Sequence, residues 1–211
     1  MIKLACCNVD DLNLPEVYRL LPEERKNKVD NFRFQKDKKL SAGAYLLLDK
    51  LLKEENITRP VFKTFQYDKP YIANHENIHF NLSHSGTFVA CAVSDRQIGA
   101  DIEYNDPQID LDIAKNYFHD SEYVNIMNAE IPSDEFFRYW VLKESYMKYT
   151  GLGFQLDLNS FEIMIINNEI SLKDDTDNLN FSLFDIDNYK MAVCSHYPVD
   201  NYSEYSVNDL Y

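Results

Sequence analysis

The chain has 211 residues, of which 45% are hydrophobic and 14% aromatic, so it can bury a globular core. Its 21 basic and 35 acidic side chains give a formal charge of −14, which argues against non-specific binding of nucleic acid. No apolar run approaches the roughly 18–20 residues that span a bilayer, and the N-terminus lacks a signal-peptide pattern. We therefore expect a soluble, cytoplasmic protein with no membrane partner.

The first half of the chain alternates strand-like and helical patterns. Residues 38–55 carry leucines at helical spacing and predict a core helix, and a second helix is expected to open at Pro22. Extended segments are expected at residues 2–9, 61–65, 70–72, 78–86, 87–94 and 98–103.

The second half repeats this alternation after an apparent boundary at residues 104–107. Helices are expected at residues 110–118 and 121–128, and strands at residues 160–166, 169–173, 180–184 and 189–196. The runs LACCNVD, FVACAVSD and KMAVCSHY resemble one another loosely, which favours a duplicated unit. We therefore predict an α+β fold with two similar lobes, residues 1–103 and 104–211.

The charge is unevenly distributed along the chain. Between Arg19 and Lys39 there are eight basic residues against four acidic ones. A basic patch inside an acidic protein favours a small anionic ligand, although a solvated helix face explains the pattern equally well.

One long helix is expected to begin at the N-cap Ser133 and to stop at Gly151. Phe136, Trp140 and Glu144 follow one another at spacings of four on one of its faces, and Lys148 continues the row. An exposed i,i+4 ion pair, worth about 0.2–0.5 kcal/mol, is the ordinary explanation for a glutamate and lysine so placed.

Asp101 and Glu103 lie two residues apart at the end of a predicted strand, so their carboxylates point the same way. Two like charges on one face are unfavourable unless a cation lies between them, and Mg²⁺ prefers such oxygen ligands. Gly99 leaves room for a ligand or a neighbouring backbone to approach. Alone, this pattern is weak, since acidic strand edges are common.

A histidine between two hydroxyls marks the preceding turn, in which Ser83 and His84 could hold phosphate oxygens. A Ser-His-Asp hydrolase is a competing interpretation, but adjacent side chains on an extended strand point apart, and no G-x-S-x-G elbow is present. The ammonium of Lys69, before Pro70, could also reach an anion.

Together, FNLSHSG, GADIE and WVLKESYMKYTGLG, with a Lys-Pro pair upstream, resemble the 4′-phosphopantetheinyl transferases of the surfactin-synthetase-activating type. The resemblance is detailed over residues 69–153. It implies a monomer of two lobes related by pseudo-two-fold symmetry, with the active site between them.

The resemblance also implies residue roles. Asp101, Glu103 and Glu144 match the family's metal-binding acids, which would hold Mg²⁺, or Mn²⁺ as an alternative, against the diphosphate of coenzyme A. Glu144 and Lys148 match its catalytic base and the lysine beside the diphosphate.

Further positions match contacts to coenzyme A, the implied substrate: Lys69, Ser83, His84 and Lys148, together with Arg25 and Lys28 after a one-residue shift. Departures from the family pattern are Leu40 where a basic residue is usual, Asp68 in place of glycine, and Ala100 in place of a larger side chain.

The implied reaction transfers phosphopantetheine from coenzyme A to a serine of an acyl or peptidyl carrier protein and releases adenosine 3′,5′-bisphosphate. Two alternatives stay open at this point. A Mg²⁺-dependent hydrolase of nucleotide diphosphates would use the same carboxylates, and a non-catalytic module would bind coenzyme A without turnover.

Overall fold

The computed structural model describes residues 1–65, 67 and 69–211, so the expectation for Asp68 lies outside the described residues. The elements of the first half are β1 (Ile2–Asn8), α1 (Leu14–Leu20), α2 (Glu23–Asp30), α3 (Gln35–Glu54), β2 (Phe62–Thr64), β3 (Pro70–Ile72), β4 (His79–Ser85) and β5 (Phe88–Ser94). Those of the second half are β6 (Ile98–Tyr104), α4 (Asp112–Tyr117), α5 (Asp120–Asn128), α6 (Pro132–Thr150), β7 (Ile163–Ile166), β8 (Glu169–Leu172), β9 (Asn180–Ile186), β10 (Tyr189–Ser195) and β11 (Ser203–Tyr205).

The two main sheets are built on the same plan. The first has the strand order β11-β1-β5-β4 and the second β6-β10-β9. In each, an initial strand is followed by a long helix and then by a hairpin whose second strand pairs antiparallel with the first: β1, α3 and β4–β5, then β6, α6 and β9–β10. The predicted α+β class, with small sheets packed with helices, is confirmed.

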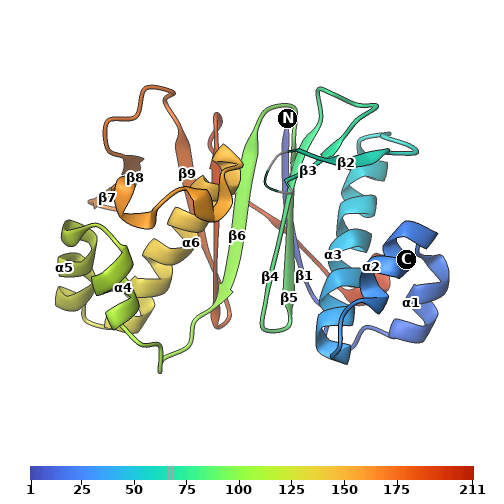
Figure 1. Cartoon of the computed structure of the whole chain (residues 1–211), viewed down its shortest axis with the longest axis horizontal. Coiled ribbons are helices and arrows are strands. Elements are labelled where there is room, and N and C mark those ends of the chain that lie inside the picture. Colours follow the sequence, from blue (N-terminus) through green and yellow to red (C-terminus); the bar gives the residue numbers. More distant parts are fainter. Residues whose placement is uncertain (66, 68) are drawn as a thin grey trace.

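The molecule is arranged in layers, with α3 outside one sheet and α6 outside the other (Figure 1). One hydrophobic cluster lies between α3 and the first sheet, and another between α6 and the second. A third cluster joins the sheets through side chains such as Cys6, Ala90, Ile102 and Met191. The two main sheets therefore share a core and form one body.

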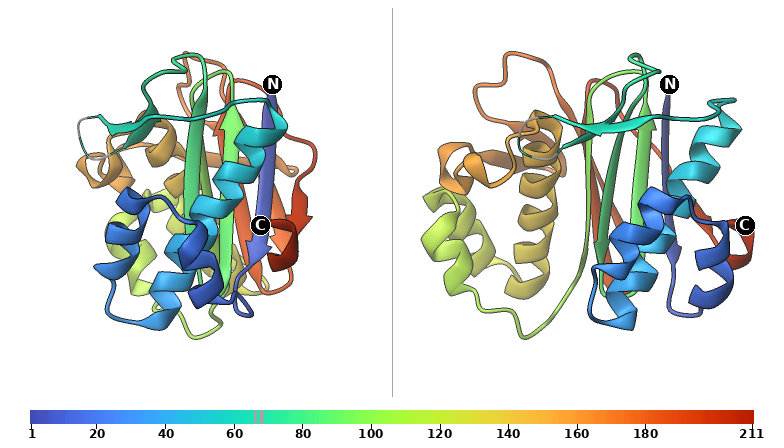
Figure 2. Two further views of the ribbon diagram at one scale, coloured as in Figure 1. Left: turned by 90° about the vertical axis from the view of Figure 1, so that its right-hand side faces the viewer. Right: turned by 45° about the vertical axis from the view of Figure 1, so that its right-hand side comes forward.

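β6 belongs to the second sheet, because all seven of its residues pair with β10. By strand pairing the two sheets divide between Ser94 and Ile98, whereas the sequence pattern predicted a lobe boundary after residue 103. The C-terminal segment also returns to the first half, since β11 pairs in parallel with β1 (Figure 2). The sequence pattern did not predict this three-residue strand.

The helix that carries the acidic and basic side chains, α6, starts two residues earlier than expected. Pro132 occupies its first turn after the N-cap Ile131, so the prediction of Ser133 as N-cap is wrong. Gly151, with φ of 76°, ends the helix in the left-handed conformation, as predicted. A Cβ atom at Gly99 would collide with the backbone of Ser145 and Tyr149, so this glycine lets α6 lie directly on β6.

Across the parts of the chain that the structure describes, none of the helices combines the length and the apolar character needed to cross a membrane.

Candidate active site

Three separated stretches of sequence meet around one cavity of about 260 Å³. They come from β4, β6 and α6, which pack against one another where the two sheets adjoin. The lining residues are Leu82, Ser83 and His84 of β4, Asp101 and Glu103 of β6, and Trp140, Glu144 and Lys148 of α6. The structure thus brings together six of the polar residues singled out from the sequence: Ser83, His84, Asp101, Glu103, Glu144 and Lys148.

The centre of the cavity is a hydrogen-bonded triangle. The Lys148 ammonium donates to Asp101 Oδ1 at 2.6 Å and to Ser83 Oγ at 2.8 Å. Ser83 Oγ in turn donates to the same Asp101 oxygen at 2.7 Å. Asp101 is 1% exposed, so this contact replaces much of the hydration that a buried carboxylate loses.

The other carboxylates of the cavity are less well compensated. Burial, followed by the charge of Asp101, raises the pKa of Glu103 to about 7. Burial and the same charge also raise the pKa of Glu144, and Lys148 only partly opposes this. Within the described chain, Asp101 Oδ2 and Glu144 Oε1 are buried with no hydrogen-bond partner. Such atoms cost free energy unless a ligand meets them.

These oxygens suit a hard divalent cation in charge and chemistry. Asp101, Glu103 and Glu144 supply only oxygen donors, two of them unpartnered, and positive charge between them would remove their mutual repulsion. Among the described residues, however, no three His, Cys, Asp or Glu side chains already form a group able to hold a metal ion. Since the Lys148 ammonium already contacts Asp101 Oδ1, a bound metal ion would share that carboxylate with Lys148 or displace the lysine from it.

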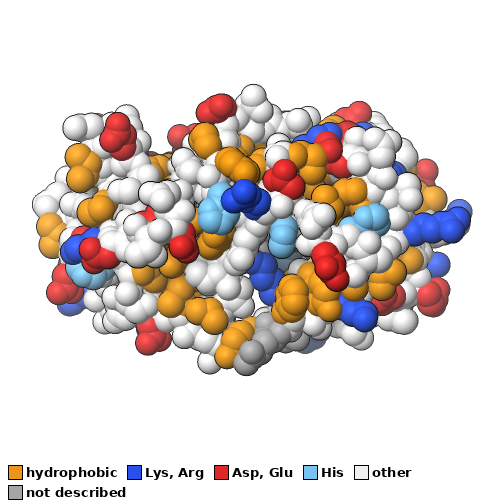
Figure 3. Space-filling model, turned by 90° about the horizontal axis from the view of Figure 1, so that it is seen from above, with side chains coloured by type: hydrophobic (Ala, Val, Ile, Leu, Met, Phe, Trp, Pro, Cys, Tyr) orange, Lys and Arg blue, Asp and Glu red, His pale blue; other side chains and the backbone are white. Residues whose placement is uncertain are grey.

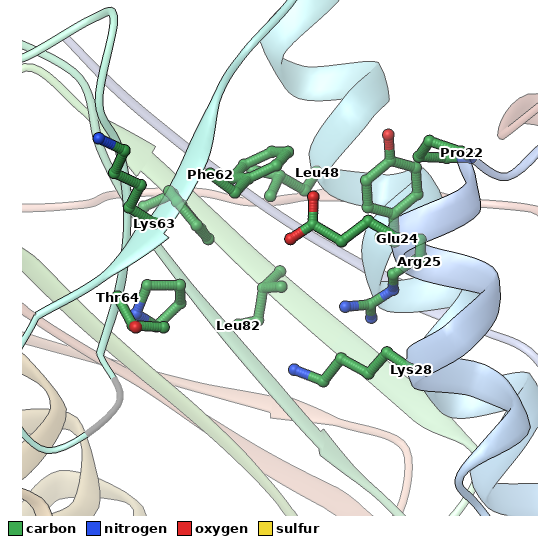
Figure 4. Close-up of a pocket in the computed structure, with 12 residues that line it drawn as sticks. Pro22, Glu24, Arg25, Lys28, Leu48, Phe62, Lys63, Thr64 and Leu82 are labelled. Carbon is green, nitrogen blue, oxygen red and sulfur yellow. The ribbon is translucent and has the colours of Figure 1, made fainter.

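A second cavity, of about 270 Å³, adjoins the first, since Leu82 lines both. Figure 4 shows the side chains of Arg25 and Lys28 reaching from α2 toward Leu82, with the β2–β3 hairpin on the far side. Burial lowers the pKa of Arg25, and partial burial with the nearby Arg25 charge lowers that of Lys28. These two cations line the cavity together with the Glu24 carboxylate and with apolar side chains such as Leu48 and Phe62.

Arg25 is also only partly satisfied. Its terminal nitrogen donates to the carbonyl of Ser41, but its buried Nε has no partner in the described part of the chain. The guanidinium lies 5.4 Å from the centre of the Tyr45 ring, which lines the same cavity. A partly buried guanidinium beside an aromatic ring is suited to a phosphorylated nucleoside.

Lys69, which the family resemblance assigns to coenzyme A, lies against the C-terminal end of α6. Its ammonium donates to the carbonyls of Lys148 and, at 3.0 Å, of Tyr149, at the C-terminal end of α6. Burial there lowers the pKa of Lys69 to about 8. This lysine lines neither cavity and instead compensates the free carbonyls of the helix end. Seen from above, basic and histidine side chains gather near the middle of the molecule, with acidic side chains beside them (Figure 3).

His84 is the exposed member of the group, and partial burial with the charge of Lys148 lowers its pKa. Leu40, which departs from the family pattern, is a buried residue of α3, and the ammonium of the neighbouring Lys39 donates to the Asp10 carbonyl. Neither residue lines the two cavities described above. Ala100 is fully buried and lets its backbone N–H reach Asn81 Oδ1 at 3.1 Å.

Two polar residues were missed from sequence. Ser85 donates to Glu103 Oε2 at 2.5 Å, and its place two residues after Ser83 was the available signal. Lys143 forms a fully buried pair with Glu122 at 2.7 Å. A lysine within an otherwise apolar stretch of α6 pointed to a buried partner, but not to which one.

Two family models match consecutive parts of the chain. Residues 11–96 match the 4′-phosphopantetheinyl transferase N-terminal model, and residues 97–194 match the 4′-phosphopantetheinyl transferase superfamily model. The 4′-phosphopantetheinyl transferase psf-1 of Bacillus pumilus is 32% identical over 184 residues, which cover 83% of this chain and 78% of the relative. The chain belongs to the 4′-phosphopantetheinyl transferase superfamily.

A second curated relative matches a shorter part of the chain. The 4′-phosphopantetheinyl transferase Sfp of Bacillus subtilis (strain 168) is 38% identical over 143 residues, which cover 65% of this chain. That alignment spans 63% of the relative's length. The crystal structure of Thermotoga maritima holo-[acyl-carrier-protein] synthase superposes with a TM-score of 0.41 and 18% identity, over 46% of this chain and 61% of that one.

Proposed function

We propose that this superfamily member is a Mg²⁺-dependent 4′-phosphopantetheinyl transferase. It would move phosphopantetheine from coenzyme A to a serine hydroxyl of an acyl or peptidyl carrier protein and release adenosine 3′,5′-bisphosphate. The observation that carries the proposal is the meeting of Asp101, Glu103, Glu144 and Lys148 in one cavity, which shares Leu82 with the basic cavity of Arg25. We also infer that it acts as a cytoplasmic monomer.

The two adjoining cavities correspond to two parts of coenzyme A. The cavity of Arg25 and Lys28 is suited to the phosphorylated adenosine, because it combines cations with apolar and aromatic walls. The acidic cavity, with Lys148 at its centre, would take the diphosphate. His84 lines the acidic cavity and is exposed, so its ring is available to a phosphate oxygen.

Three carboxylates around a diphosphate require a cation. Asp101, Glu103 and Glu144 would hold Mg²⁺, or Mn²⁺ in its place, and a bound divalent ion would neutralise charge on the diphosphate oxygens. The residues' own part is to position the diphosphate so that the incoming serine comes within reach of Glu144.

The chain's own groups can then carry the proton and the charge. The carrier serine oxygen would attack the phosphorus on the pantetheine side, and the bond from that phosphorus to the leaving phosphate oxygen would break. Glu144 would accept the serine proton directly or through water. Lys148 would stabilise the charge that develops on adenosine 3′,5′-bisphosphate.

The direct test is the intact mass of a carrier protein after incubation with this protein, coenzyme A and Mg²⁺. We expect the carrier to gain the mass of one phosphopantetheine group, and a carrier with alanine in place of its serine to gain none. Release of adenosine 3′,5′-bisphosphate without a carrier would identify a hydrolase instead. Binding of coenzyme A without any mass gain, tested across several acyl and peptidyl carriers, would identify a non-catalytic module.

A further inference from the structure

The seam between the two sheets is held by side chains of β4. The strands β4 and β6 lie side by side in the same direction, yet they belong to different sheets and no backbone ladder joins them over the described residues. Three residues at alternate positions of β4 reach across instead: Asn81, Ser83 and Ser85. Alternate residues of a strand share a face, so one face of β4 provides all three contacts.

Each contact has its own acceptor or donor on β6. Asn81 Oδ1 accepts from the backbone N–H of Ala100 at 3.1 Å, and Ser83 Oγ donates to Asp101 at 2.7 Å. Ser85 Oγ donates to Glu103 Oε2 at 2.5 Å and accepts from the Tyr104 N–H at 3.1 Å. The contacts to the two acids thus repeat at a constant separation of 18 residues.

We propose that Ser85 is a positioning residue that holds the Glu103 carboxylate in the orientation needed for a divalent cation. The proposal rests on the function proposed above. Ser85 Oγ donates one hydrogen bond and accepts another from a rigid backbone group, so its rotation about the Cβ–Oγ bond is fixed. Glu103 is thereby held through one oxygen.

A substitution at Ser85 tests the orientation of one carboxylate more selectively than a substitution at Ser83. Ser83 also accepts a hydrogen bond from Lys148, so its replacement would disturb the lysine and the aspartate together. Within the described chain Ser85 makes no hydrogen bond to Lys148 or Glu144, and it does not line the acidic cavity. Its loss should therefore act through Glu103 and the adjacent Tyr104 N–H, and leave the contacts of Lys148 in place. Partners that orient metal ligands typically contribute roughly 10–100-fold to metal affinity.

The test compares Mg²⁺ affinity of the full-length protein by titration calorimetry, with coenzyme A present at saturation and no carrier. We expect Ser85→Ala to weaken Mg²⁺ binding about 10–100-fold. Ser85→Thr, which keeps the hydroxyl, should bind within about threefold of wild type if the same hydrogen bond forms. Ser182→Ala is the matched control, because Ser182 Oγ accepts from Val199 N at 3.0 Å in a strand remote from the cavity.

Carrier loading by the same variants gives a second readout. Ser85→Ala should raise the Mg²⁺ concentration for half-maximal loading while the rate at saturating Mg²⁺ stays near wild type. Unchanged Mg²⁺ affinity in Ser85→Ala, or a loss of rate that excess Mg²⁺ does not restore in a folded variant, would overturn the inference. If the wild-type protein itself neither binds Mg²⁺ nor loads any carrier, the proposed function fails first.

Discussion

Two lysines of α6, five residues apart, form ion pairs of opposite character. Lys143 and Glu122 are both fully buried and 2.7 Å apart. Within the described chain, each of their side-chain polar atoms has a hydrogen-bond partner. Lys143 also donates to the Phe161 carbonyl at 2.9 Å, while Glu122 accepts from the backbone of Ile163 and His119. We call this the structural pair.

The second pair, Lys148 and Asp101, opens on the cavity. The lysine side chain is 27% exposed, and the carboxylate beside it keeps one buried oxygen without a partner in the described chain. We call this the site pair. An ammonium and a carboxylate therefore stabilise the fold where their polar atoms find partners inside the protein. They become available to a ligand where some are left over.

The largest expected effect comes from removing a site carboxylate. We expect Glu144→Gln to lower carrier loading about 10²–10⁴-fold, because the amide cannot accept the serine proton. The thermal midpoint should stay the same or rise, since Glu144 Oε1 has no partner to lose. Loading rate and thermal melting of the same preparation measure both effects. Near-normal loading in excess Mg²⁺ would remove Glu144 from the mechanism.

The structural pair should give the opposite result. Lys143→Ala leaves Glu122 charged and buried without its cation, so we expect the protein to lose about 3–5 kcal/mol of unfolding free energy. Urea denaturation of wild type and variant measures this loss. Lys148→Ala is the matched control on the same helix and should be much less destabilising, while slowing the chemical step more than it weakens coenzyme A binding. Equal destabilisation by both changes would erase the distinction between the pairs.

A smaller effect is expected in the basic cavity. Lys28→Ala and Arg25→Ala should each weaken coenzyme A binding by about 1.5–3 kcal/mol, the usual value of a hydrogen bond to a charged group. Binding of dephospho-coenzyme A, which lacks the 3′-phosphate, should be affected less. Calorimetric titration with both ligands checks this. Unequal losses would show which cation meets the 3′-phosphate, and no loss in either variant would contradict the placement of the nucleotide.

The smallest effect concerns pH and Mg²⁺. The pKa of Glu103 is about 7 in the folded protein against 4.5 ordinarily. Between these values the unfolded chain has released a proton that the native state keeps, so stability falls as pH rises, and the cost is complete above pH 7. Glu103→Gln should therefore gain about 1–3 kcal/mol over wild type at pH 8 without Mg²⁺, and nothing below pH 4.5.

Mg²⁺ should reverse this difference, because a bound cation favours the ionised carboxylate. Thermal melts of wild type and Glu103→Gln at pH 5.5 and pH 8, with and without Mg²⁺, provide the comparison. The rise in melting temperature caused by Mg²⁺ should be larger at pH 8, and larger in wild type. A Mg²⁺ effect that is independent of pH would contradict the assignment.

The comparison also shows what the sequence could predict. A two-residue strand period singled out Asp101 and Glu103 and a four-residue helix period singled out Glu144, but each pattern alone was weak, and the family resemblance supplied their roles. Lys148 was found in the same way. Both signals depend only on neighbours in the chain, and the cavity that unites them agrees with that interpretation.

Contacts between distant segments left no such signal. Lys69 contacts carbonyls at the end of α6 that lie 79 and 80 residues later in the chain. The partner of Lys143 depends on how α5 packs on α6. The assignment of β6 to the second sheet follows from pairing with β10, some 90 residues later, which local hydrophobicity cannot indicate. These features follow from tertiary packing and needed the structure.

The central claim is that the carboxylates of β6 and α6 act on one cation beside coenzyme A. A crystal structure of the protein with coenzyme A and Mn²⁺, located by its anomalous scattering, tests it most directly. We predict one ion in the acidic cavity, with carboxylate oxygens of Asp101, Glu103 and Glu144 and a diphosphate oxygen at about 2.0–2.3 Å. An ion bound without Glu144, or a diphosphate bound outside this cavity, would contradict the account.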